Sequence, residues 1–98
     1  IAQGIGLALS EVFEDLKKHT SLLKCGIPYP NDIPDDIELV YQENHPRPLG
    51  PYGAAGCGEG PLAAPHPAIL NAIYSATGAR ITRVPARPEV VKAALDAL

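Results

Sequence analysis

The sequence predicts an α+β fold in which helices pack on a small mixed sheet. Two observations predict it: three stretches carry apolar residues at three- and four-residue spacing, and short β-branched or alternating runs lie between them. The order is helix, strand, strand, long loop, helix, strand, helix. At 98 residues, with 46% hydrophobic and 19% charged residues, the chain is long enough for one domain with a modest core.

The first helical pattern starts at Ile1 and is expected to stop by His19. Glu14 and Lys18 on its polar face are spaced for a favourable ion pair. Gly4 and Gly6 each cost about 1 kcal/mol relative to Ala inside a helix, so they predict close packing against another backbone. The apolar face of this helix is expected to be buried and consists of Ile1, Ile5, Ala8, Leu9, Val12, Phe13 and Leu16.

Two further helices are predicted from their proline and glycine boundaries. One begins near Pro67, where the missing N–H costs nothing, and ends at Gly78, a natural residue to follow a helix. The last helix begins at Pro88. Their buried faces are expected to be Ile69, Leu70, Ile73 and Ala76/Thr77 in the first, and Val91, Ala94/Leu95 and Leu98 in the second.

The predicted strands are short. Residues 37–43 form the best candidate, with alternating apolar residues, and residues 21–26 form a weak one. Residues 79–84 read as a strand with Ile81 inward and Arg80 outward. Residues 44–64 have no periodicity, and such a segment in a compact domain is usually functional or disordered. We expect an ordered, functional segment, with apolar anchors that include Leu49 and Tyr52.

Composition excludes some classes of partner. The net charge of -3 and the scattered Lys and Arg residues give no basic surface for nucleic acid. No apolar run approaches the roughly 20 residues that a membrane span needs. Cys25 and Cys57 form no metal-ligand pattern, and a disulfide between them stays an open alternative. The histidines at 19, 45 and 66 are dispersed, as surface or capping residues are.

The main functional candidate is a glycine-framed carboxylate. Residues 50–61 contain five of the nine glycines, and Glu59 lies between Gly58 and Gly60. Glycine lets a backbone approach another group closely. A carboxylate held in a water-poor pocket has its pKa raised toward neutrality, which suits a general base. The leading hypothesis is therefore that Glu59 is a catalytic base; the alternative is an exposed loop carboxylate, the commonest fate of a Glu.

Two other kinds of chemistry are weaker candidates. Cys57 and His66 could form a thiol nucleophile and its base, but no third, orienting group is evident, and a small apolar filler is the favoured interpretation of Cys57. Residues 53–58 could form a phosphate loop, but the Lys-Ser/Thr ending is missing and Glu59 would repel phosphate.

Residues 53–62, followed by 64–73, resemble the C-terminal part of the molybdenum-binding subunit of the molybdenum hydroxylases, the xanthine dehydrogenase and aldehyde oxidoreductase family. The similarity is greatest to prokaryotic aldehyde oxidoreductases. It extends to the Gln3–Leu7 stretch, Ile27-Pro28, residues 37–41 and residues 79–88. Cys57 departs from the family, whose members more often carry a small aliphatic residue there, so its thiol is expected to be incidental.

The resemblance implies that residues 1–98 are the C-terminal segment of a molybdopterin-binding domain. Glu59 would then be the general base beside molybdenum, with the backbone of Gly56, Cys57 and Gly58 close to the metal and no metal ligand in this chain. The implied cofactor is molybdopterin cytosine dinucleotide, with [2Fe–2S] clusters elsewhere in the enzyme and FAD in another subunit as a further option.

The partners implied by the resemblance are the rest of the molybdenum-binding subunit, the iron–sulfur domain and a small aldehyde or heterocycle, in a cytoplasmic enzyme. The segment alone is not expected to be active. The alternative function, from a different class, is a stand-alone, non-catalytic α+β binding or assembly module descended from such an enzyme.

Overall fold

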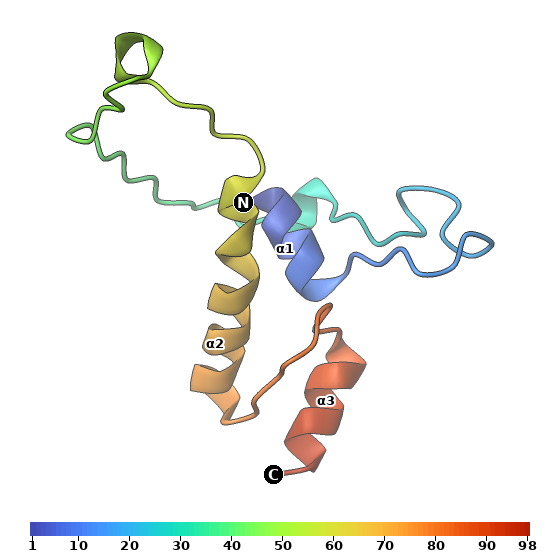
Figure 1. Cartoon of the computed structure of the whole chain (residues 1–98). Helices are drawn as coiled ribbons and strands as arrows, with labels where there is room; N and C mark the ends of the chain where they lie inside the picture. The colour runs from blue at the N-terminus through green and yellow to red at the C-terminus, as the bar shows by residue number, and fades with distance from the viewer.

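Three helices joined by long loops make up the protein (Figure 1). A computed structural model describes all residues from 1 to 98. The helices are α1 (Ala2–Leu9), α2 (Pro65–Thr77) and α3 (Pro88–Asp96), and the short 3₁₀ turns are η1 (Pro30–Asp32), η2 (Pro51–Gly53) and η3 (Gly60–Ala63). There is no β-strand, so the predicted mixed sheet, and with it the α+β class, is wrong for this chain.

Helix α1 packs against α2 and η3, and three of its residues, Gly4, Gly6 and Ala8, are buried. A Cβ atom added to Gly4 would lie 2.5 Å from Cβ of Pro65, and one added to Gly6 would lie 2.8 Å from Cδ of Pro28. Both distances are far below van der Waals contact, so only glycine fits. The predicted close packing is confirmed, but the partners are proline rings rather than another backbone.

Helix α1 ends at Leu9, much earlier than predicted. The hydroxyl of Ser10 donates to the carbonyl oxygen of Gly26 at 2.6 Å, and the N–H of Val12 donates to the carbonyl oxygen of Cys25 at 2.8 Å. These groups bind the returning chain instead of continuing the helix. Phe13 and Leu16 consequently lie outside α1 and are exposed, so their predicted burial is wrong within this chain.

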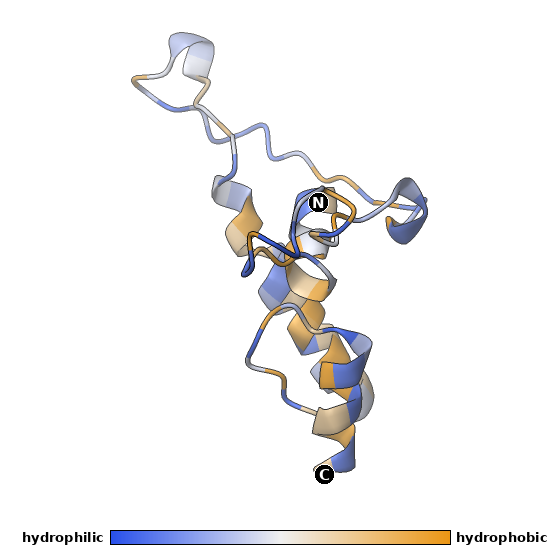
Figure 2. Ribbon diagram, turned by 90° about the vertical axis from the view of Figure 1, so that its right-hand side faces the viewer, coloured by the Kyte–Doolittle hydropathy of each residue, from blue (hydrophilic) through white to orange (hydrophobic).

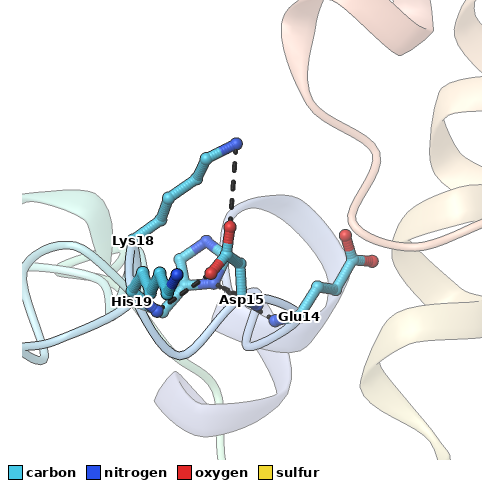
Figure 3. Close-up of polar contacts among 5 residues, drawn as sticks. Glu14, Asp15, Lys18 and His19 are labelled. Carbon is cyan, nitrogen blue, oxygen red and sulfur yellow. Dashed lines mark hydrogen bonds and ion pairs between the residues drawn. The ribbon is translucent and has the colours of Figure 1, made fainter.

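A tight turn replaces the predicted second half of the first helix (Figure 3). His19 Nδ1 accepts hydrogen bonds from the backbone N–H groups of Glu14 and Asp15, each at 3.1 Å. Lys18 Nζ lies 3.8 Å from Asp15 Oδ2, so Lys18 pairs with Asp15 and the predicted pair with Glu14 is wrong. His19, expected to be a surface or capping residue, is half-buried and accepts from N–H groups of a turn rather than of a helix end.

Helices α2 and α3 agree with the prediction at most of their boundaries. Helix α2 begins at Pro65, two residues before the predicted start, and is followed by Gly78 with φ 75°, as predicted. Helix α3 begins at Pro88 as predicted. The most covered face of α2 holds Ile69, Leu70, Ile73 and Thr77, and in α3 it holds Val91 and Ala94. Leu98 is exposed, contrary to the prediction.

The segment between α2 and α3 returns to the end of α1. Ile81 is buried and Arg80 is exposed, with its guanidinium group 3.7 Å from the centre of the Tyr74 ring. The N–H of Ala86 donates to the carbonyl oxygen of Ala8 at 2.6 Å. The inward and outward sides predicted for this segment are therefore confirmed, but it pairs with a helix end and forms no strand.

The chain is extended for its length. Its accessible surface is 8003 Å², against about 5,400 Å² expected for a compact protein of its 10.3 kDa mass. Its radius of gyration is 16.9 Å, against about 13 Å for a compact domain. Apolar residues lie on the extended loops as well as along the helices (Figure 2). No helix combines the length and apolar character that crossing a membrane requires.

Candidate functional site

Glu59 lies where the long loop meets the helical part of the molecule. It directly precedes η3, which leads into α2, and its backbone has φ -92° and ψ 0°. Its side chain is tied to α1, because Gln3 Nε2 donates a hydrogen bond to Glu59 Oε1 at 2.8 Å. The candidate base and its hydrogen-bond donor are separated by 56 residues in sequence.

Packing of α1 on the following elements brings these two residues together. Helix α1 contacts both η3 and α2, and the start of α1 lies beside η3 (Figure 1). The contact between Gly4 and Pro65 sets the distance between α1 and the start of α2. Since Gln3 precedes Gly4 and Glu59 lies six residues before Pro65, this contact also determines where the two side chains meet.

The glycines around Glu59 have no explanation within the chain. A Cβ atom added to Gly56, Gly58 or Gly60 would meet nothing within 4 Å. None of the three has the positive φ that favours glycine, unlike Gly26, Gly53 and Gly78, which do. Neither packing within the chain nor backbone conformation therefore requires glycine at these positions. Close approach by a group from outside the chain would require it. Gly56 and Gly58 are two of the three residues predicted to lie near the cofactor; the third, Cys57, is exposed.

Cys57 and His66 do not form a catalytic pair in this structure. His66 Nδ1 lies 3.1 Å from the carbonyl oxygen of Leu62, and no hydrogen bond joins it to Cys57. Cys57 is exposed, so it fills no core space within the chain. Cys25 and Cys57 are both free, which excludes the disulfide that the sequence left open.

No group of three or more His, Cys, Asp or Glu side chains is placed to hold a metal ion. The loop that leads to Glu59 lacks the predicted anchors: Leu49 and Tyr52 are fully exposed, so the prediction that they anchor it is wrong within this chain.

Gln3 is the site residue that sequence reasoning missed. Its only signal was its place in the Gln3–Leu7 stretch that resembles the molybdenum hydroxylases. A polar residue at the start of a helix gives no indication of a partner 56 residues away. Only the packing of α1 against η3 and α2 shows that contact.

Comparison with known proteins confirms the class that the resemblance indicated: the chain matches a segment of a molybdenum hydroxylase. The sequence is 62% identical over 97 residues to the aldehyde oxidoreductase of Megalodesulfovibrio gigas, covering 99% of this chain and 11% of that protein. No protein-family model matches the chain.

Solved structures give the same match. The aldehyde oxidoreductase from Desulfovibrio gigas, activated with sodium dithionite and sodium sulfide, superimposes with a TM-score of 0.89 at 62% identity, over 97% of this chain and 10% of its own. The aldehyde oxidoreductase from Desulfovibrio desulfuricans ATCC 27774 gives a TM-score of 0.86 at 60% identity, over 99% of this chain and 10% of its own. The extended shape is thus the one that similar segments adopt within proteins about ten times longer.

Proposed function

We propose that this chain is the C-terminal segment of the molybdopterin-binding domain of an oxidoreductase. The enzyme hydroxylates an aldehyde to a carboxylic acid, or a related carbonyl compound or heterocycle, and Glu59 is its general base. The observation that carries the proposal is the match to aldehyde oxidoreductases over 99% of the chain at 62% identity. The glycine frame of Glu59 and its hydrogen bond to Gln3 support the assignment of the base.

Glu59 has the geometry to accept a proton. The bond from Gln3 engages Oε1, and no other hydrogen bond within the chain engages the carboxylate. Oε2 is therefore free to take a proton from the oxygen nucleophile that attacks the substrate carbon, which is the task of a general base. The bare backbone at Gly58 and Gly60 leaves room for the nucleophile and substrate beside it.

The residues present fit a cofactor that approaches from outside the chain. The backbone of Gly56, Cys57 and Gly58 would lie against it, because no side chain larger than the exposed Cys57 stands there. When bound, molybdopterin cytosine dinucleotide would supply the two-electron oxidation, with electrons leaving through [2Fe–2S] clusters and, in one arrangement, FAD in another subunit. The remainder of the molybdenum-binding subunit and the iron–sulfur domain are the partners that this proposal requires.

The alternative of a stand-alone binding module is disfavoured by burial. Only six of the 98 residues are buried, and only one of them, Ile81, has a large apolar side chain. A module that acts alone needs a core of its own to offset the loss of conformational entropy.

The test is a Glu59→Gln substitution in the full-length protein that carries this segment. We expect turnover of acetaldehyde or benzaldehyde with a dye acceptor to fall by about 10²-fold or more, the range for loss of a general base. Molybdenum content should be unchanged, because no metal ligand is altered. Glu43→Gln is the matched control: Glu43 is another exposed carboxylate on the same loop, and this variant should keep normal activity. Near-normal turnover in Glu59→Gln would sink the assigned role.

A further inference from the structure

We propose that Gln3 is a positioning residue for Glu59: its side-chain amide holds one carboxylate oxygen so that the other faces the reacting atoms. This inference rests on the proposed role of Glu59 as the base. It adds a residue from the N-terminal helix, 56 positions before Glu59, to the residues that serve the reaction. The carrying observation is the 2.8 Å hydrogen bond from Gln3 Nε2 to Glu59 Oε1.

The two ends of this hydrogen bond differ in how firmly they are held. Gln3 belongs to α1, and the residue after it, Gly4, is buried against Pro65 at the start of α2. Glu59 belongs to a loop in which a Cβ atom added to the neighbouring Gly58 or Gly60 would meet nothing within 4 Å. A glutamate in such a loop has three side-chain torsions and a permissive backbone to sample. The helix therefore restrains the loop carboxylate, and not the reverse.

The chemistry of the pair also fits this role. An ionised carboxylate only accepts hydrogen bonds, and the amide nitrogen of glutamine only donates them. The bond thus occupies Oε1 without placing a competing donor on Oε2. A base must lie within hydrogen-bond reach of the proton that it removes, and an error of about 1 Å in such positioning can lower a rate by about 10²-fold.

A purely structural role for the same bond gives different expectations. Gln3 could simply tie residues 44–59 to the helices. Its loss would then loosen the loop and lower the molybdenum content or the thermal half-life of the enzyme. A positioning role instead lowers kcat for each bound molybdenum and leaves KM and molybdenum content little changed, because the amide then acts only on the carboxylate of Glu59.

The experiment compares Gln3→Met and Gln42→Met in the full-length holoenzyme. Methionine keeps the length of the side chain and removes the amide donor. Gln42, the other glutamine in the chain, is exposed on the loop and makes no side-chain hydrogen bond, so it is a matched control. We expect Gln3→Met to lower kcat about 5- to 30-fold, with KM and molybdenum content within about twofold of the parent, and Gln42→Met to change neither constant.

A second measurement tests whether Gln3 acts through Glu59. In a Glu59→Asp background the carboxylate is one methylene shorter and withdraws from the amide. Adding Gln3→Met to that variant should lower single-turnover rates by less than about twofold, so that the two substitutions are non-additive. A full additional loss would overturn the proposal, because Gln3 would then act independently of Glu59.

Other outcomes separate this inference from the proposed function. An unchanged kcat in Gln3→Met, or a loss explained wholly by lower molybdenum content, overturns the positioning role alone if Glu59→Gln is inactive. Substantial activity in Glu59→Gln overturns the assigned base, whatever Gln3→Met does.

Discussion

Gly4 is the residue on which the arrangement of α1 and α2 depends most directly. We predict that Gly4→Ala destabilises the full-length protein, even though alanine favours a helix by about 1 kcal/mol over glycine. The added Cβ would lie 2.5 Å from Cβ and Cγ of Pro65, a rigid ring that cannot swing away. Such overpacking costs about 1–3 kcal/mol, so the clash outweighs the gain in helix propensity. The half-life of thermal inactivation should shorten accordingly.

The control for Gly4→Ala is its combination with Pro65→Ala. Removing the proline ring takes away the atoms that the new methyl group would meet, so the double variant should recover most of the lost half-life. If the double variant is as labile as the sum of the single changes, the loss has another origin than the contact between α1 and α2.

Among the individual residues, the sequence predicts Glu59 as a candidate general base but does not predict its hydrogen-bond donor, Gln3. Glycines on both sides of a lone carboxylate form a local pattern, which can be seen without a fold. Gln3 lies 56 residues from Glu59, and its role becomes visible only when α1 packs against η3. Local patterns identify a reactive group, whereas the groups that orient it come from tertiary structure.

At the scale of elements, the hydroxyl of Thr77 is expected to stabilise the C-terminal end of α2. Thr77 Oγ1 donates to the carbonyl oxygen of Ile73 at 2.7 Å and accepts from the N–H of Ala79 at 3.1 Å. We predict that Thr77→Val, which keeps the shape, leaves the N–H of Ala79 without this partner and costs about 1 kcal/mol. Amides at the end of α2 should exchange with solvent about fivefold faster in the full-length protein, measured by mass spectrometry.

Thr82→Val is the matched control for this substitution. Thr82 is exposed, its hydroxyl makes no hydrogen bond within the chain, and it lies in the next segment. Its replacement should leave exchange in α2 unchanged. Equal acceleration by both substitutions would show that the effect is not specific to the end of α2.

The helices and the predicted strands show which sequence patterns are sufficient to predict an element. Pro88 at the start of α3 and Gly78 after α2 act through the local backbone, and both boundaries were predicted correctly. The strands were predicted wrongly. Alternating apolar residues show only that one side of a segment is buried and the other exposed, and a strand also needs a neighbouring strand to pair with. Residues 79–84 bury Ala79 and Ile81, but no strand lies beside them, and the hydrogen bond to the end of α1 is made beyond them, by the N–H of Ala86.

The whole molecule exposes more surface to solvent than a compact protein of its mass. The accessible area exceeds that of a compact protein of equal mass by roughly 2,600 Å². If that excess were one side of an interface, the two sides together would bury about 5,200 Å², at the upper end of the range for obligate interfaces. The exposed side chains include Leu22, Leu23, Val40, Tyr41 and Leu49 on the loops. Of these, the sequence predicted only Leu49 as an anchor, and Leu49 packs against nothing within the chain.

The last prediction follows from this surface. The isolated chain of residues 1–98 should fail to form a cooperative fold at 25 °C, because its buried core is too small to offset the entropy of ordering 98 residues. Circular dichroism should show a broad thermal change without a sharp midpoint, and the dye ANS should bind to the exposed apolar surface. The same chain within the full-length protein should resist proteolysis in residues 11–29 and 33–59. A sharp two-state transition in the isolated chain, with the hydrodynamic radius of a compact monomer, would contradict this expectation and favour the stand-alone module.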